Sequence, residues 1–575
     1  MSPAGSRPGA LIDYDVAVRM RDGAVLIADV YRPIGVGAAP TIVQRTPYGK
    51  SVPEHLNYSF NLLRAVRSGW NVVVQDVRGR GCSTGSFDPF RHETGDGYET
   101  LSWIAAQEWS DGAIAMVGGS YPGAAQWLAA LGGHPNLRAL APAMTPDDYY
   151  DGWINDGGAR RLGFHANWIY ESLWAGLAQR AHVTAPRAEI RAELKGVLTA
   201  PGHTDFTPYG ELAAPFLRTW SEHPTRDEYW ASISPRDNLK HIAAPAFVIA
   251  GWFDVFGRGA INGFMKLRSD GTTAHVRAKT RLVVGPWTHG QFAGTFTDID
   301  FGPDSTAQAI DLTGLQLRWF DHVVRGRAID AVDDPAVRVF VMGADEWRTF
   351  DAWPPVTATP LELELRSDPA TLSKDPQMPT GQRAITHDPS NPVPTLGGGT
   401  FLHGRHLALN AGPREQTATG DRPDILRYES GPLVEQMQII GRVRVRLGVS
   451  CDQPDANVTA KLVIVIPDGK AWGLVDGVLR LSHRDGDEVP RPLEPGQVYS
   501  IGFTVGHTAV VVPAGARLRL DVAASNFPHI ADTRSSADGD PATSARLRQV
   551  TIHTGGQHRS TLFVDTVPED SRRNG

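Results

Sequence analysis

The sequence predicts three structural parts: a parallel α/β sheet domain, a helical segment inserted into it, and a C-terminal all-β domain. Buried-strand patterns alternate with helix patterns up to residue 142 and again from residue 246, which is typical of a parallel sheet covered on both faces. The segment between them is rich in Trp, Tyr, Arg and Ala at helical spacing, with no clear strand. A chain of 575 residues is too long for one core. We therefore assign residues 1–145 and 241–354 to the sheet domain, 146–240 to the insertion and 355–575 to the all-β domain.

The sheet domain is expected to begin with an antiparallel hairpin over residues 13–33. Apolar and polar residues alternate there on both sides of the turn signal Arg21-Asp22-Gly23. Short apolar runs then predict buried parallel strands, and three longer patterns predict helices. The expected strands are 41–44, 71–75, 114–117, 246–250 and 281–284, and the expected helices are about 57–68, 124–131 and 306–325.

The all-β domain is predicted from eight short alternating segments separated by Gly, Pro and Asp. Many strands without intervening helices indicate a sandwich or a jelly roll. The segments are 360–366, 437–450, 458–466, 497–504, 507–512, 516–523, 548–553 and 561–566.

Composition excludes several classes of partner. The net charge is −7 and there is no basic run, so nothing favours nucleic acid as a partner. No run reaches the ~18 apolar residues of a membrane span, and the first ten residues contain no apolar stretch. Two distant cysteines, Cys82 and Cys451, exclude a disulfide framework. We expect a cytoplasmic location, and we expect no metal or cofactor because no ligand motif is present.

Ser120 is the candidate nucleophile. It lies in Gly118-Gly119-Ser120-Tyr121-Pro122-Gly123, between a predicted strand and a predicted helix. A tight turn of this kind exposes a serine hydroxyl above the sheet, and the helix directs its free N–H groups toward the site. Pro122 stands where the usual motif has its second Gly, so the pattern alone fits an ordinary glycine-rich turn equally well.

A serine nucleophile needs a base and a carboxylate that orients the base. Asp254 and His289 each follow a predicted buried strand, in the chain order serine, acid, histidine. Asp254 could instead cap a helix. Asp76 is the rival acid, although Arg78 and Arg80 nearby indicate a structural ion pair.

Two donors are expected for the negatively charged oxygen of an acyl-transfer intermediate. The backbone N–H of Tyr121, next to the nucleophile, is the first. The loop that should supply the second reads Arg45-Thr46-Pro47-Tyr48-Gly49-Lys50, and Pro47 has no N–H to offer. The Tyr48 hydroxyl is the natural substitute, although position alone fits a packed aromatic residue just as well.

These motifs resemble the cocaine esterase family, a branch of the X-Pro dipeptidyl-peptidase-like hydrolases. The resemblance covers nearly the whole chain, in order. It rests on residues 45–50, 75–81, 118–123, 251–254, 285–289, 338–343, 346–347, 466–469 and 525–528.

The resemblance implies an α/β-hydrolase fold with an inserted helical cap and a C-terminal all-β jelly-roll domain. It also implies a Ser120–His289–Asp254 triad, with the Tyr48 hydroxyl and the Tyr121 N–H as oxyanion donors. Family members hold the acyl group in an aromatic pocket between the three parts. The matching positions are Trp153, Trp168, Phe256, Phe401 and Leu402, each of which could instead only pack the cap.

The expected activity is that of a serine carboxylesterase cleaving an ester with an apolar, aromatic acyl group. Relatives that accept α-amino acyl groups carry carboxylates soon after the acid, where this chain has Val255, Phe256 and Gly257. An amidase, a peptidase or an acyltransferase could use the same triad, and an inactive binding protein is a third alternative. The partner is a small ester or amide, and a homodimer through the all-β surface is compatible with the sequence.

Overall fold

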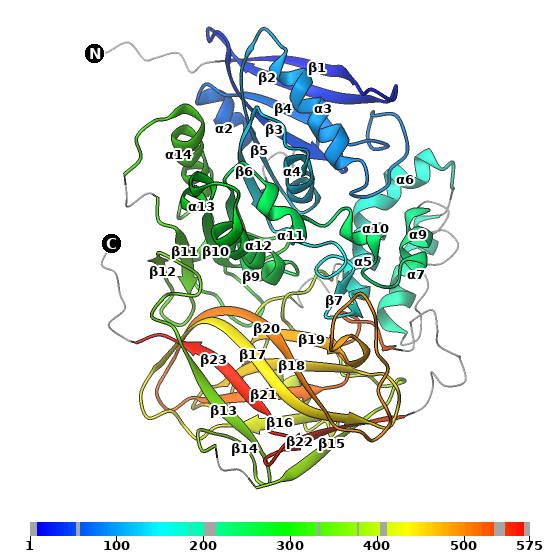
Figure 1. The fold of residues 1–575 in the computed structure, drawn as a ribbon, viewed down its shortest axis with the longest axis vertical. Coiled ribbons are helices and arrows are strands. Elements are labelled where there is room, and N and C mark those ends of the chain that lie inside the picture. The colour runs from blue at the N-terminus through cyan, green and yellow to red at the C-terminus, as the bar shows by residue number, and fades with distance from the viewer. Residues whose placement is uncertain are drawn as a thin grey trace.

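A computed structural model describes two large sheets at opposite ends of the molecule (Figure 1). Among the described residues, the first sheet runs from Ala10 to Phe350 and the second from Thr359 to Thr566. The predicted boundary at residue 355 falls between them, and the exact domain limits stay a prediction. The described residues are 9–52, 58–184, 186–200, 214–330, 334–376, 379–402, 411–533 and 547–568.

The first sheet has antiparallel strands at both ends and parallel strands in its centre. The β1–β2 hairpin agrees with the hairpin predicted from the sequence. The seven central strands are mutually parallel, so their carboxyl ends lie along one edge. In spatial order the strands are β1 (Ala10–Arg19), β2 (Val25–Pro33), β4 (Asn71–Asp76), β3 (Ala39–Thr46), β5 (Ser110–Gly119), β6 (Leu137–Ala143), β9 (Phe247–Phe253), β10 (Arg281–Thr288), β11 (Val337–Val341) and β12 (Glu346–Phe350).

Helices pack against this sheet and connect its strands. All three predicted helices are present: α2 and α14 are shorter than expected and α4 begins three residues earlier, while α3, α12 and α13 were not predicted. The helices are α2 (Leu62–Arg67), α3 (Glu93–Ala105), α4 (Tyr121–Leu131), α12 (Gly257–Asp270), α13 (Ala274–Lys279) and α14 (Leu312–Arg325), with a 3₁₀ turn η3 (Pro303–Ser305).

The insertion lies beside the junction of the two sheets (Figure 1) and is mainly helical. It also contains a two-stranded sheet of β7 (Asn155–Asp156) and β8 (Ala159–Arg160), which the sequence did not indicate. Its helices are α5 (Leu162–Asn167), the π-helix η1 (Trp168–Leu173), α6 (Trp174–Arg180), α7 (Arg187–Thr199), α9 (Phe216–Glu222), α10 (Glu228–Ala231), α11 (Pro235–Asn238) and the 3₁₀ turn η2 (Leu239–His241).

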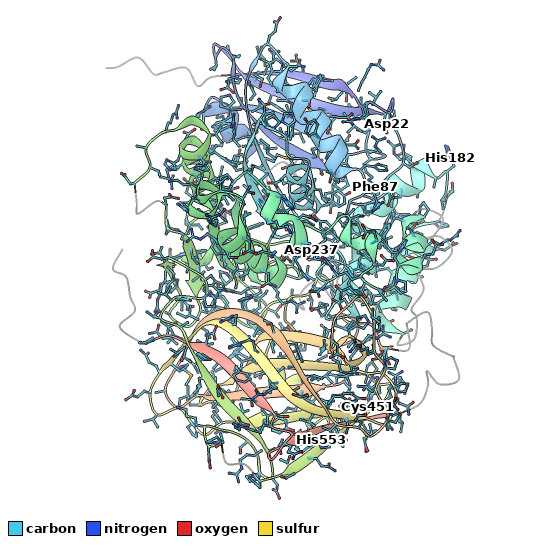
Figure 2. All side chains as sticks on the ribbon, in the orientation of Figure 1. Asp22, Phe87, His182, Asp237, Cys451 and His553 are labelled. Carbon is cyan, nitrogen blue, oxygen red and sulfur yellow. The ribbon has the colours of Figure 1, made fainter. Side chains whose placement is uncertain are left out.

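The all-β domain forms the second sheet, which is antiparallel in nearly all its pairings. Cys451 lies in this domain (Figure 2) and Cys82 in the sheet domain, and both thiols are free. The strands are β13 (Thr359–Ser367), β14 (Ala370–Ser373), β15 (Gly381–His387), β16 (Ile425–Glu429), β17 (Met437–Cys451), β18 (Asn457–Val465), β19 (Ala471–Arg480), β20 (Tyr499–Val512), β21 (Arg517–Ala523), β22 (Arg548–Thr554) and β23 (Thr561–Thr566), with 3₁₀ turns η4 (Gln416–Thr419) and η5 (Leu481–His483).

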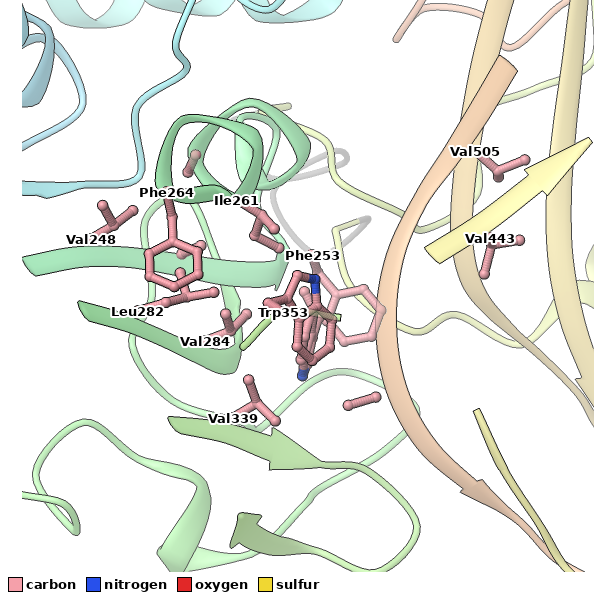
Figure 3. Close-up of a cluster of buried hydrophobic side chains, with 14 of the residues drawn as sticks. Val248, Phe253, Ile261, Phe264, Leu282, Val284, Val339, Trp353, Val443 and Val505 are labelled. Carbon is pink, nitrogen blue, oxygen red and sulfur yellow. The ribbon is translucent and has the colours of Figure 1, made fainter. Parts of the chain in front are cut away.

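One hydrophobic core continues across the boundary between the sheet domain and the all-β domain. Ile261 of α12 and Trp353 lie in the same buried cluster as Val443 and Val505 of the second sheet (Figure 3). At about 25 cal/mol per Å² of buried apolar surface, such a shared core favours one fixed arrangement of the two domains. The all-β domain therefore presents a fixed surface to the loops at the carboxyl edge of the first sheet.

Candidate active site

Ser120 lies at the sharp turn between β5 and α4, with backbone angles φ 62° and ψ −129°. A positive φ is strained for a residue with a side chain, and it is the conformation that exposes a nucleophilic serine above a sheet. The turn is crowded: a Cβ at Gly118 would lie 2.5 Å from Pro122 Cβ, and one at Gly119 would lie 2.4 Å from the Tyr58 ring. Both positions therefore require glycine.

Asp254 and His289 follow the ends of β9 and β10, as the sequence predicted. His289 Nε2 lies 3.0 Å from Ser120 Oγ, and His289 Nδ1 lies 2.8 Å from Asp254 Oδ2. With the carboxylate accepting the Nδ1–H, Nε2 is left free to accept the Ser120 hydroxyl proton. The structure thus brings the three candidate residues into one hydrogen-bonded chain.

The Asp254 carboxylate is fully buried and held on both oxygens. Its second oxygen, Oδ1, accepts the backbone N–H of Phe256 at 2.6 Å. The all-β domain touches the same loop, because a Cβ at Gly399 would lie 2.8 Å from the Asp254 carbonyl oxygen. The second domain therefore packs closely against the loop that carries the candidate acid.

Asp76, the rival acid, has a different role. Its carboxylate accepts the backbone N–H groups of Lys50 at 2.7 Å and Cys82 at 3.1 Å. The expected ion pair with Arg78 or Arg80 was wrong, because backbone donors already satisfy the Asp76 oxygens, and Arg78 pairs with Asp96 instead. Asp76 fixes the loop that carries Tyr48.

The Tyr48 hydroxyl lies close to the nucleophile and to the Tyr121 N–H, the other expected oxyanion donor. It is in hydrogen-bonding contact with the Ser120 side chain and with the backbone N–H of Tyr121, and it accepts the indole N–H of Trp168 at 3.0 Å. Burial raises the pKa of Tyr48, an effect that Trp168, Ser120 and the Arg80 charge partly oppose. The phenol therefore stays protonated at neutral pH and can donate a hydrogen bond.

Comparison with known proteins supports a family assignment for this geometry. A family model of the X-Pro dipeptidyl-peptidase (S15 family) matches residues 22–291, and one of the X-Pro dipeptidyl-peptidase C-terminal non-catalytic domain matches residues 330–563. Cocaine esterase from Rhodococcus sp. (strain MB1 Bresler) is 34% identical, over 96% of this chain and 98% of its own length. The chain belongs to the cocaine esterase family. The two matched models also correspond to an α/β-hydrolase domain followed by an all-β domain, as expected.

Solved structures of distant relatives share the fold of this cocaine esterase family member. An aminopeptidase from the marine sediment archaeon Thaumarchaeota archaeon superposes with a TM-score of 0.80 at 21% identity, covering 99% of this chain and 98% of that chain. An α-amino acid ester hydrolase superposes with a TM-score of 0.79 at 21% identity, covering 98% of both chains. All three parts of the chain are therefore common to the fold.

The five predicted pocket residues lie together beside His289 in this family member. The Phe256 ring meets the His289 imidazole edge-on at 5.0 Å, and the Phe401 ring does so at 4.9 Å. Trp153 stacks on Phe256 at 4.6 Å, and Trp168 meets Trp153 at 5.3 Å. Leu402 belongs to the same buried cluster. These contacts form an apolar, ring-lined wall beside the base.

Two side-chain contacts that support the site were not predicted from the sequence. The Tyr58 hydroxyl donates to the carbonyl oxygen of His289 and so holds the base loop. The Tyr121 hydroxyl donates to Glu93 at 3.0 Å, and Glu93 pairs with Arg45 at 2.5 Å. Neither pattern is visible in the sequence, because each pair joins segments separated by a strand or more.

Within the described residues, no group of three His, Cys, Asp or Glu side chains is arranged to hold a metal ion. No described helix is long and apolar enough to cross a membrane.

Proposed function

We propose that this chain is a serine carboxylesterase that cleaves an ester with an apolar, aromatic acyl group through an acyl-enzyme on Ser120. The single observation that carries the proposal is the hydrogen-bonded chain from Ser120 through His289 to Asp254. The family assignment supports a serine ester hydrolase independently of that geometry. An intact triad also argues against an inactive binding protein.

The proposed mechanism has two steps. His289 Nε2 takes the Ser120 proton as Oγ attacks the ester carbonyl, and the imidazolium that forms is stabilised by Asp254. The Tyr48 hydroxyl and the Tyr121 N–H donate to the developing oxyanion, the alcohol leaves with the proton from His289, and the acyl group remains on Ser120. Water, activated by His289, then releases the acid.

The preference for an apolar acyl group follows from the residues after the acid. Val255 and Phe256 are buried, and neither they nor Gly257 can pair with a substrate ammonium. The ring-lined wall beside His289 suits a planar acyl group, which it would bury at little entropic cost. An α-amino acyl substrate would leave its charge unpaired there.

Peptide-bond cleavage is the second candidate, favoured by the match to the X-Pro dipeptidyl-peptidase family model. The triad serves ester and amide alike, so the distinction lies in the binding of a substrate amine. An acyltransferase would differ only in the acceptor that takes the acyl group from Ser120.

The test is a substrate screen with purified wild-type protein and Ser120→Ala. We expect hydrolysis of p-nitrophenyl benzoate, slower turnover of the acetate, and no release from Ala-Pro-p-nitroanilide. Ser120→Ala should abolish all turnover, and retained activity would contradict the assignment of Ser120. Faster cleavage of the anilide than of any ester would favour the peptidase, and acyl transfer to added alcohol in preference to water would favour the transferase.

A cytoplasmic location and a homodimer also stay proposals. Two free thiols support a reducing compartment, since oxidising compartments favour disulfides. Sedimentation velocity would determine the oligomeric state directly.

A further inference from the structure

Arg80 is a buried cation without a carboxylate partner among the described residues. Arg80 is only 5% exposed to solvent. Nε donates to the carbonyl oxygen of Pro47 at 2.7 Å, and both terminal nitrogens lie 3.4 Å from the carbonyl oxygen of Leu173. Arg78, two residues earlier, shows the ordinary arrangement, because it pairs with both Asp96 and Asp22. Burying an unneutralised charge is costly, so Arg80 needs an explanation.

Two parts of the structure pack against the Arg80 guanidinium. The Phe87 ring, at the boundary between the sheet domain and the insertion (Figure 2), lies 5.3 Å from it. Helix α6 of the insertion approaches through Gly176, where a Cβ would lie 3.1 Å from Arg80 Nη2. Burial lowers the pKa of Arg80 to about 10, which still leaves it charged at neutral pH.

The Arg80 side chain acts on the segment that carries Tyr48. Pro47, whose carbonyl Arg80 binds, directly precedes Tyr48, so this hydrogen bond fixes the backbone that aims the phenol. The Arg80 charge also acts on the phenol itself, because it lowers the pKa of Tyr48 against the effect of burial. A water-excluded site preserves such an interaction, whereas a paired carboxylate would cancel it.

We propose that Arg80 is a positioning residue of the oxyanion site: it holds the Tyr48 loop through Pro47, and its unpaired charge favours the negative oxygen that Tyr48 binds. This inference rests on the proposed function, because it needs a reaction in which an oxyanion develops at Tyr48. It also explains why, among the described residues, the hydrogen bonds of the guanidinium go to backbone carbonyls and not to a carboxylate. Neutral carbonyl oxygens fix the position of the guanidinium without cancelling its positive charge.

The test is a double-mutant cycle of Arg80→Met and Tyr48→Phe, with p-nitrophenyl benzoate as substrate. Arg80→Met alone should lower kcat roughly tenfold or more, with KM changed less than about twofold. In the Tyr48→Phe background the same substitution should lower kcat less than about threefold, because the group through which Arg80 acts is gone. Additive losses in kcat would overturn the inference. Phenylboronic acid, which forms a tetrahedral adduct on a serine, should lose affinity in parallel with kcat, and an unchanged affinity would also overturn it.

Arg78→Met is the matched control, since it removes the neighbouring guanidinium from the same loop. It is expected to lower the melting temperature while its kcat loss, unlike that of Arg80→Met, adds to that of Tyr48→Phe. If Arg80→Met fails to fold, Arg80→Lys enters the same cycle, and additivity again overturns the inference. Failure of the proposed function is distinguishable, because wild-type protein would then hydrolyse no ester or Ser120→Ala would retain activity.

Discussion

The hydrogen bond from the Trp168 indole to the Tyr48 hydroxyl joins the insertion to the oxyanion site. A hydroxyl that accepts one hydrogen bond becomes a better donor of its own proton, because hydrogen bonds in a chain polarise one another. Trp168 therefore has two roles in the proposed mechanism: its ring is one of those proposed to hold the acyl group, and its N–H strengthens a donor.

Trp168→Phe should separate these two roles, since it keeps an aromatic ring and removes the N–H. We expect kcat for p-nitrophenyl benzoate to fall about 2- to 10-fold, the usual value of one neutral hydrogen bond, with a smaller change in KM. Trp230→Phe makes the same change elsewhere in the insertion, where the indole donates to the His223 carbonyl instead. Equal kcat losses in the two variants would show that the bond to Tyr48 is only structural.

At this scale the sequence predicted the candidate triad but not its supports. Ser120, Asp254 and His289 could be predicted because each follows a strand whose carboxyl end must lie at the same edge of the sheet. The contact between Trp168 and Tyr48 joins residues 120 positions apart. Only the docking of the insertion onto the sheet domain creates it, and no local pattern records that docking.

At the scale of elements, a buried ion pair ties β3 to α3 and α4. Arg45 of β3 and Glu93 at the start of α3 have side chains only 1% and 4% exposed. Glu93 also accepts the hydroxyl of Tyr121, the first residue of α4, and burial raises the pKa of Glu93. One carboxylate thus orients the helix that carries the Tyr121 N–H, one of the two proposed oxyanion donors.

Glu93→Leu should destabilise the protein by about 3–5 kcal/mol, because it leaves Arg45 buried without its partner. Urea unfolding at neutral pH would measure the loss. The double variant Arg45→Met, Glu93→Leu should recover most of the stability, since an apolar pair of similar size removes both charges. If the double variant is as unstable as the single one, the Glu93 bond to Tyr121 carries the stability instead of the ion pair.

Helix α3 shows why some elements could not be predicted. Its sequence, ETGDGYETLSWIA, contains two glycines, which disfavour a helix by roughly 1 kcal/mol each. Gly97 is nevertheless required, because a Cβ there would lie 2.6 Å from the Ala129 Cβ of α4. Close packing between two helices outweighs local propensity, and propensity is all that a single sequence displays.

At the scale of the whole molecule, His507 joins the two large domains. It lies on β20, accepts the indole N–H of Trp353 at Nδ1 with a distance of 3.1 Å, and places Nε2 3.4 Å from Asn262 Oδ1 on α12. Burial, together with the charges of Arg442 and Arg258, lowers the pKa of His507 to about 3. The imidazole is therefore neutral in the folded protein.

The pKa of His507 predicts a loss of stability in mild acid. Below pH ~6.5 the unfolded chain binds a proton at this histidine that the folded protein excludes, so stability present above pH ~6.5 is lost as the pH falls toward 3. The loss from this group should reach roughly 1–2 kcal/mol at pH 5.

His507→Gln should reduce the fall in melting temperature between pH 7 and pH 5. His241→Gln, at an exposed position, provides the control and should leave the wild-type pH profile unchanged. A His507→Gln profile parallel to that of the wild type would show that other groups cause the acid sensitivity.

The tryptophan side chains of the insertion form a row that reports on the candidate site by its optical properties. Trp153, Trp168 and Trp220 follow one another at centroid separations of 5.3 and 6.3 Å, and Trp230 continues the row at 5.9 Å. Chromophores this close share their excitation, so light absorbed anywhere along the row can be emitted beside Tyr48. Binding of an acyl group at the proposed site should therefore alter the ultraviolet circular dichroism and the emission of the whole row, and binding could be followed without a label.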